Sequence, residues 1–192
     1  MKIYDISQEV FSCKVYPGDP KPEKLTLCAT GKGDLYNLTA FSMCAHNGTH
    51  IDAPFHFLDK GKTVEQMNLN MFIGDCYVAR QNGVVTGADA AAILERAEGL
   101  PRILIAGEAV VSAEAAEVFA NAGICLLGNE SQSVGPEAAP MQVHKILLGK
   151  DVAILEGVVL TEIPQGRYFL SAAPLNLGGA DGAPCRAYLI EE

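Results

Sequence analysis

The sequence of 192 residues has few basic side chains and no long apolar run. Its 14 Lys and Arg stand against 23 Asp and Glu, which gives a formal net charge of −9. Nucleic-acid-binding proteins and proteins of anionic membrane surfaces rely on clustered positive charge, so this composition argues against both. No apolar stretch approaches the roughly 20 residues of a membrane-spanning helix, and the first ten residues lack the apolar block of a signal peptide. We therefore expect a soluble cytoplasmic protein.

Closely spaced cysteine pairs are also missing. The six cysteines lie far apart along the chain, and none forms a CxxC pair. This spacing excludes a zinc ribbon and a thioredoxin-like site. We interpret the cysteines as small side chains packed inside a protein of a reducing compartment.

The remaining composition, with 49% hydrophobic residues, predicts one globular domain over residues 1–192. Helices are predicted over 86–99, where Thr86 is a suitable N-cap, over 112–123 and over 141–148. Short apolar runs separated by turns predict more strands than helices. The expected fold class is α/β, with a mixed β-sheet and few helices. The runs predicted as strands are 2–7, 24–30, 38–45, 72–79, 102–107, 124–128, 152–160, 167–175 and 186–192.

Three of the four histidines of the chain fall within one stretch of eleven residues. His46, His50 and His56 stand with Asp52 in the pattern H-x-x-x-H-x-D-x-x-x-H. Imidazole and carboxylate groups bind zinc and similar ions, and three protein ligands with one open position are typical of a catalytic site. Packing alone rarely clusters such residues, so the pattern predicts a metal site.

The backbone must bend for these residues to share an ion. In a straight strand His46 and His50 would stand about 13 Å apart. We expect a strand to end near Ala45 and the chain to bend at Gly48 and Thr49, which brings Asp52 to the same ion. The zincin motif is excluded, since asparagine follows the first histidine where a HExxH helix needs glutamate.

A second pair of candidate ligands lies farther along the chain. Glu156 interrupts the apolar run 152–160, and a carboxylate on a buried strand is costly unless it is paired or bound to a metal. His144, the remaining histidine, precedes it by twelve residues. The alternative is that Glu156 faces solvent on an edge strand.

Residues 46–56 read HNGTHIDAPFH, which resembles the signature HxGTHxDxPxH of the metal-dependent cyclase family at every fixed position. This family includes bacterial kynurenine formamidase and isatin hydrolase. The resemblance extends through YPGDP at 16–20, LLGNESQSVGP at 126–136 and RAYLI at 186–190. It implies a swivelling β/β/α fold, usually assembled as dimers or larger oligomers, and here we expect a homodimer or homotetramer.

The resemblance also implies how a metal would be held. His46, His50 and Asp52 would bind one ion, and Asp52 would bridge to a second ion held by His144 and Glu156. The implied cofactor is one or two divalent ions per chain, with Zn²⁺ as the first expectation and Mn²⁺ as the alternative.

The same resemblance implies a reaction. His56 would be the general acid/base in hydrolysis of an amide-type bond of a small molecule, with N-formylkynurenine or a related aryl formamide as the first expected substrate. Tyr16 stands where these formamidases tend to carry a tryptophan that contacts the substrate, and this chain has no tryptophan. Tyr16 is therefore the candidate substrate-binding residue.

Two other functions stay open. A lyase or cyclase could use the same metal on a hydroxy-carbonyl substrate, and a non-catalytic protein could simply bind a divalent ion. A hydrolase predicts that His56→Ala retains the metal and loses turnover, whereas a metal-binding protein has no reaction to lose.

Overall fold

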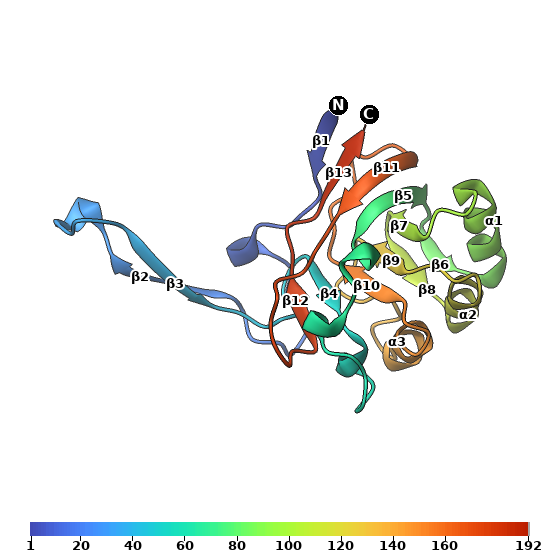
Figure 1. Cartoon of the computed structure of the whole chain (residues 1–192), viewed down its shortest axis with the longest axis horizontal. Helices are drawn as coiled ribbons and strands as arrows, with labels where there is room; N and C mark the ends of the chain where they lie inside the picture. Colours follow the sequence, from blue (N-terminus) through green and yellow to red (C-terminus); the bar gives the residue numbers. More distant parts are fainter. Residues whose placement is uncertain (192) are drawn as a thin grey trace.

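The computed structural model describes residues 1–191, and a curled mixed β-sheet forms its centre (Figure 1). The strands of this sheet are β1 (Lys2–Asp5), β4 (His50–Asp52), β5 (Ile73–Arg80), β7 (Arg102–Ala106), β9 (Leu126–Asn129), β10 (Ala153–Glu156), β11 (Gly166–Ser171), β12 (Gly182–Pro184) and β13 (Tyr188–Glu191). They lie in the order β1-β13-β11-β5-β7-β9-β10-β4-β12. The four strands from β5 to β10 run parallel, and the strands on both flanks pair antiparallel.

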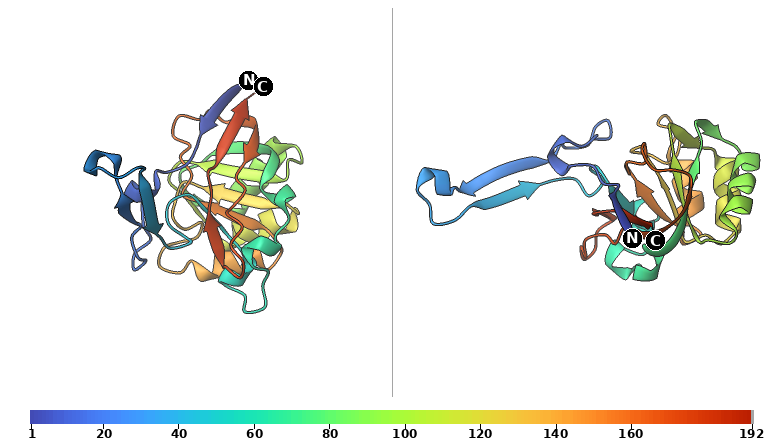
Figure 2. Two further views of the ribbon diagram at one scale, coloured as in Figure 1. Left: turned by 60° about the vertical axis from the view of Figure 1, so that its left-hand side comes forward. Right: turned by 90° about the horizontal axis from the view of Figure 1, so that it is seen from above.

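Three helices cover one face of the sheet (Figures 1 and 2). In the sequence, each helix follows a strand that pairs in parallel, either directly or one loop later. They are α1 (Gly87–Ala97), α2 (Ala113–Asn121) and α3 (Met141–Leu148). The predicted start of α1 is confirmed, because the Thr86 hydroxyl accepts a hydrogen bond from the Asp89 N–H and the Asp89 carboxylate accepts one from the Thr86 N–H. All three helices and the mixed sheet agree with the expected fold class.

The two faces of the sheet carry separate hydrophobic cores, because alternate residues of a strand point to opposite faces. Ile103 and Ile154 pack beneath the helices, in the same core as Phe119 of α2. Leu104 and Leu155, their neighbours in sequence, belong to the opposite core, around which the sheet curls. A small parallel pair, β6 (Gly83–Val85) and β8 (Ala109–Val111), lies next to the helices.

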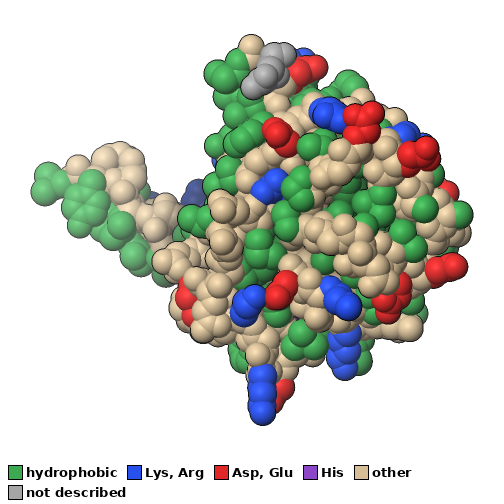
Figure 3. Space-filling model, turned by 45° about the vertical axis from the view of Figure 1, so that its right-hand side comes forward, with side chains coloured by type: hydrophobic (Ala, Val, Ile, Leu, Met, Phe, Trp, Pro, Cys, Tyr) green, Lys and Arg blue, Asp and Glu red, His purple; other side chains and the backbone are tan. Residues whose placement is uncertain are grey.

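A long hairpin formed by β2 (Glu23–Cys28) and β3 (Leu38–Ser42) projects away from the rest of the molecule, and we call residues 23–42 the arm (Figures 1 and 2). Several of its large apolar side chains face solvent, among them Leu25, which is 59% exposed, and Phe41, which is 58% exposed. Figure 3 shows hydrophobic side chains along this projecting segment. The arm therefore exposes apolar surface without a covering layer.

Several predicted strands are shorter than expected. The run 38–45 is a strand only to Ser42, and the run 152–160 only from Ala153 to Glu156. Of the predicted run 186–192, Tyr188–Glu191 forms β13, and residue 192 lies outside the described residues. The three-residue strands β4, β6, β8 and β12 were not predicted. Among residues 1–191, the helices are too short or too polar to cross a bilayer.

Candidate metal centre

The bend predicted before the second histidine is present. Gly48 has a φ of +65°, a left-handed conformation that glycine adopts without strain. The Thr49 hydroxyl fixes the bend, since it donates a hydrogen bond to the Gly157 carbonyl at 2.7 Å. The preceding strand ends at Ser42 rather than near Ala45, so the first histidine lies in a turn and the second begins β4.

Strand β4 places two candidate ligands on one face of the sheet. His50 and Asp52 are two residues apart, so their side chains point the same way, while Ile51 between them points into the opposite core. Strand β10 pairs with β4 antiparallel, and Glu156 lies directly opposite His50. Glu156 is therefore buried on a central strand rather than exposed at an edge.

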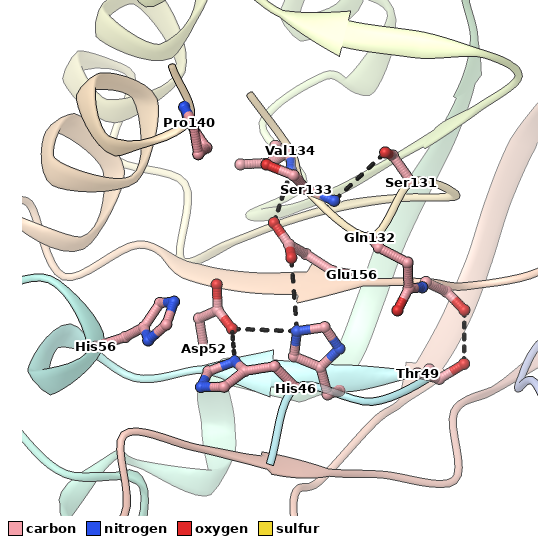
Figure 4. Close-up of polar contacts among 12 residues, drawn as sticks. His46, Thr49, Asp52, His56, Ser131, Gln132, Ser133, Val134, Pro140 and Glu156 are labelled. Atoms are coloured by element: carbon pink, nitrogen blue, oxygen red, sulfur yellow. Dashed lines mark hydrogen bonds and ion pairs between the residues drawn. The ribbon is translucent and has the colours of Figure 1, made fainter. Parts of the chain in front are cut away.

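Candidate ligands from β4, β10 and the adjoining bend converge within this face, and Figure 4 shows His46, Asp52 and Glu156 pointing toward one another. The fifth candidate, His144, reaches the same face from α3. The Asp52 Oδ1 atom lies 2.8 Å from His46 Nδ1 and 3.3 Å from His50 Nε2, and its Oδ2 atom lies 3.4 Å from His144 Nε2 on α3. Glu156 lies 3.1 Å from His144 Nε2 through Oε1 and 3.5 Å from His50 Nε2 through Oε2. Both carboxylates therefore extend between two groups of imidazoles.

Two buried atoms of this cluster have no hydrogen-bond partner among residues 1–191: His50 Nε2 and Asp52 Oδ2. Buried polar atoms without partners are rare and costly. The His50 ring is already oriented, because its Nδ1–H donates to the Gly48 carbonyl at 3.0 Å. Its Nε2 atom is thus directed at the carboxylates, as expected of a metal ligand held by an outer hydrogen bond. The donor set fits a divalent metal ion.

The electrostatics of the cluster favour bound cations. Burial lowers the pKa of each imidazole, but the carboxylates beside them outweigh this effect and raise the pKa to about 9 for His50, about 10 for His144 and about 11 for His46. Burial would raise the pKa of Asp52, yet the positively charged imidazoles of His144, His46 and His50 beside it hold it well below its usual range. These imidazoles hold protons firmly, and a metal ion must displace them.

His56 lies at the edge of the cluster, at the end of the 3₁₀ turn Pro54–His56. Its ring stacks on that of His46, with ring centroids 4.0 Å apart. Its Nδ1 atom lies 3.1 Å from Asp181 Oδ2, and its side chain is 28% exposed. His56 also offers a ligand atom within 4.8 Å of those of His46 and Asp52, so the distances alone would allow it to bind a metal.

Asp181, which no sequence pattern singles out, also belongs to this site. Its Oδ2 atom lies 2.9 Å from His46 Nε2 as well as near His56. The hydrogen bond from His46 lowers the pKa of the Asp181 carboxyl strongly. A single aspartate near the C-terminal end of the chain carries no spacing signal, and only the pairing of β12 with β4 brings it to the histidines.

A cavity of about 240 Å³ opens beside the cluster and is large enough for part of a small organic molecule. His46, His50, His56, His144 and Glu156 line it. Tyr16 also lines the cavity, and its hydroxyl donates to the Glu137 carbonyl at 3.2 Å. The arrangement combines possible metal ligands, an accessible imidazole and an aromatic wall. It can therefore bind a small molecule beside a proton-transfer group.

The chain is similar to known proteins over most of its length. The sequence profile of the Cyclase family matches residues 4–136. The chain is 34% identical over 204 residues to kynurenine formamidase of Erythrobacter litoralis, covering 99% of this chain and 94% of that protein. It is also 34% identical over 209 residues to kynurenine formamidase of Paracidovorax citrulli, covering 97% and 95% of the two chains.

Solved structures show the same fold. One, described as a potential metal-dependent hydrolase with cyclase activity, superposes with a TM-score of 0.84 at 30% identity and covers 98% of this chain and 96% of that one. Isatin hydrolase A from Labrenzia aggregata, bound to benzyl benzoate, gives a TM-score of 0.83 at 20% identity and covers 100% and 94% of the two chains. These similarities extend over nearly the full length of each pair.

Proposed function

The chain belongs to the Cyclase family of metal-dependent hydrolases, and we propose that it hydrolyses the amide-type carbon–nitrogen bond of a small aryl formamide. N-formylkynurenine is the first substrate to test, because relatives named kynurenine formamidase match nearly the whole chain. The observation that carries the proposal is the pair of buried ligand atoms without partners, His50 Nε2 and Asp52 Oδ2, beside an accessible histidine.

We propose that the chain holds two divalent ions, with Zn²⁺ favoured over Mn²⁺ by the number of imidazole ligands. His46, His50 and Asp52 would hold one ion, and His144, Asp52 and Glu156 would hold the other. The support is the orientation of Asp52, whose two oxygens lie near different histidines. A bound divalent ion supplies a Lewis acid for a carbonyl group and lowers the pKa of water to about 7.

The residues of this chain supply the proton transfers. Imidazole is the usual general acid/base near neutral pH, and His56 lines the cavity with its Nδ1 atom already engaged by Asp181. As water adds to the formyl carbon, His56 Nε2 accepts a proton from it. The same nitrogen then delivers a proton to the amide nitrogen as the carbon–nitrogen bond breaks, which yields an arylamine and formate. Tyr16 would bind the aromatic part of the substrate against the cavity wall.

The test compares the Zn²⁺-reconstituted protein with its His56→Ala variant on N-formylkynurenine. We expect the wild type to release formate and the variant to lose about 10²–10⁴-fold in kcat while it retains the wild-type metal content. Loss of metal in the variant would instead identify His56 as a ligand. Inertness of the metal-loaded wild type toward aryl formamides, with dehydration of a hydroxy-carbonyl compound, would favour a lyase.

We propose further that the protein is a homodimer or homotetramer, in which the arm contacts a second copy of the chain. An isolated two-stranded hairpin is marginally stable in water, and the arm has apolar residues on both of its faces. Leu25 pairs with Ala40 on one face, and Phe41 pairs with Lys24 on the other. Because every copy carries an arm, one two-fold symmetric contact would cover two arms at once.

Light scattering after size exclusion tests this assembly. Leu27 lies two residues from Leu25 on β2 and is 53% exposed. We expect the double variant Leu25→Ser and Leu27→Ser to shift the protein toward monomer. Val84→Ser is the matched control, since Val84 is 62% exposed on β6 outside the arm. A wild type that is already monomeric at micromolar concentration would contradict the proposal.

A cytoplasmic location is proposed on the ground that all six cysteines are free thiols.

A further inference from the structure

We propose that Asp181 is a positioning residue that fixes the tautomers of both His46 and His56, and thereby keeps one ring nitrogen of each free for its task. This inference rests on the proposed hydrolase function, in which His46 binds metal and His56 transfers protons. Asp181 is not placed among the metal ligands, and it does not need to touch the substrate.

A single oxygen atom makes both contacts. Asp181 Oδ2 lies 2.9 Å from His46 Nε2 and 3.1 Å from His56 Nδ1. An ionised carboxylate only accepts hydrogen bonds, so both of these ring nitrogens must carry hydrogen. A neutral imidazole has one N–H, so His56 Nε2 holds the free lone pair of its ring. His46 Nδ1 faces the Asp52 carboxylate, and it gains a free lone pair once a metal ion displaces the proton between them.

These two nitrogens face the groups on which they would act: His46 Nδ1 faces the candidate metal ligands, and His56 lines the cavity. His46 Nδ1 lies 2.8 Å from Asp52 Oδ1, on the side of the candidate metal ligands. His56 Nε2 has no hydrogen-bond partner among residues 1–191, and His56 lines the cavity. The Asp181 carboxylate thus orients both a metal ligand, His46, and a general base, His56.

The other two histidines of the chain are held differently. His50 Nδ1 donates to the Gly48 carbonyl at 3.0 Å, and His144 Nδ1 donates to the Pro140 carbonyl at 2.8 Å. Each of the four imidazoles therefore has one nitrogen engaged by an outer acceptor, as is usual for histidines of metal sites. For His46 and His56 the described residues offer one shared acceptor, and a side-chain substitution can remove it.

The backbone holds Asp181 firmly beside both rings. Its carbonyl accepts a hydrogen bond from the Ala53 N–H at 2.9 Å, and the next residue, Gly182, pairs with Asp52 across β12 and β4. A Cβ atom at Gly182 would lie 2.7 Å from His46 Cε1, so only glycine allows β12 to approach this ring. The carboxylate is therefore positioned by the sheet rather than by a mobile loop.

Nitrogen NMR of the imidazole rings tests the inference directly. The chain has four histidines, so long-range ¹H–¹⁵N spectra of the Zn²⁺-loaded protein are simple, and His56→Gln assigns the His56 signals. In the wild type we expect the Nδ1–H tautomer for His56. In Asp181→Ala we expect the Nε2–H tautomer, and Asp181→Asn should retain part of the wild-type population because its amide oxygen can still accept.

Kinetics on N-formylkynurenine provide the second readout. Asp181→Ala should lower kcat about 10–100-fold with KM within about two-fold of wild type, and Asp181→Asn should recover part of the loss. Asp59→Ala is the matched control, because the substitution removes the same charge. Asp59 is exposed and its side chain makes no hydrogen bond or ion pair within residues 1–191. This control should behave as wild type in both measurements.

The outcomes separate the two proposals. If the wild type hydrolyses the formamide while Asp181→Ala keeps the His56 tautomer and the wild-type kcat, the positioning role is wrong and the hydrolase function stands. If the wild type is inactive but Asp181→Ala changes the tautomer, the hydrolase function fails and the positioning contact stands. A change in Asp59→Ala equal to that in Asp181→Ala would attribute the effect to net charge and overturn the inference.

Discussion

Removal of metal should make the stability of this protein fall as the pH rises, in contrast to the metal-loaded form. His50 is almost fully buried, and its pKa in the folded protein is about 9 against 6.5 for an ordinary histidine. A raised pKa in the folded state contributes stability below pH 6.5, and that contribution is lost as the pH rises toward 9. In the metal-loaded form the imidazoles are already deprotonated, and fewer protons compete with the ion at high pH.

The magnitude follows from the same two pKa values. Each pKa unit corresponds to about 1.4 kcal/mol, so the difference at His50 amounts to about 3 kcal/mol by pH 9. His144 and His46 share the same carboxylates with His50, and their contributions overlap with its own. For a domain of this size about 1 kcal/mol shifts Tm by roughly 2–4 °C, so we expect Tm to fall by about 6–12 °C.

Differential scanning calorimetry in EDTA between pH 6 and pH 9 measures this change, with the Zn²⁺-loaded protein scanned alongside. The His50→Gln variant is the control, because it removes one titrating ring and should weaken the pH dependence in EDTA, while His144 and His46 still titrate. A metal-free wild type whose Tm stays constant or rises across this range would refute the reasoning, since the buried carboxylates would then not be holding protons on the imidazoles.

Two further predictions concern the metal ligands and the cavity wall. Elemental mass spectrometry should find about two Zn²⁺ per chain in the wild type, about one in His144→Ala and none in Asp52→Ala, whose oxygens lie near both groups of histidines; equal losses in the two variants would contradict two separable sites. Tyr16→Ala should raise KM for an aryl formamide about five-fold, which is the loss of roughly 1 kcal/mol of aromatic contact, and should leave KM for an alkyl formamide unchanged in initial-rate assays. A parallel increase for both substrates would remove Tyr16 from aromatic recognition.

Local chemistry explains which parts of the fold the sequence could predict. Helix α1 begins where Thr86 and Asp89 cap each other, and such caps are visible in the sequence. Strand β4 was missed because its three residues, His50–Asp52, are mostly polar, and it forms only through pairing with β10 and β12. The single domain over 1–192 stays a prediction.

The candidate site likewise contains residues that the sequence pattern reveals and residues that only the strand pairing brings together. The cluster from His46 to His56 is visible because its residues are close in sequence. Glu156 could be singled out only as a charge inside an apolar run, and its position opposite His50 depends on strand register. Asp181 was missed altogether, because it reaches the histidines through a strand pairing between residues more than a hundred positions apart. The roles assigned to these residues stay predictions.

The alternation along β4 and β10 has a consequence for how this protein can change. His50 and Asp52 face the candidate metal centre, while Ile51 between them is completely buried in the opposite core, and Leu155 has the same relation to Glu156. A one-residue insertion in either strand would exchange the two faces. It would direct carboxylate and imidazole groups into the apolar core and isoleucine or leucine into the cavity. Evolution or design can therefore vary this site by substitution, but insertions and deletions must be confined to the loops outside these two strands.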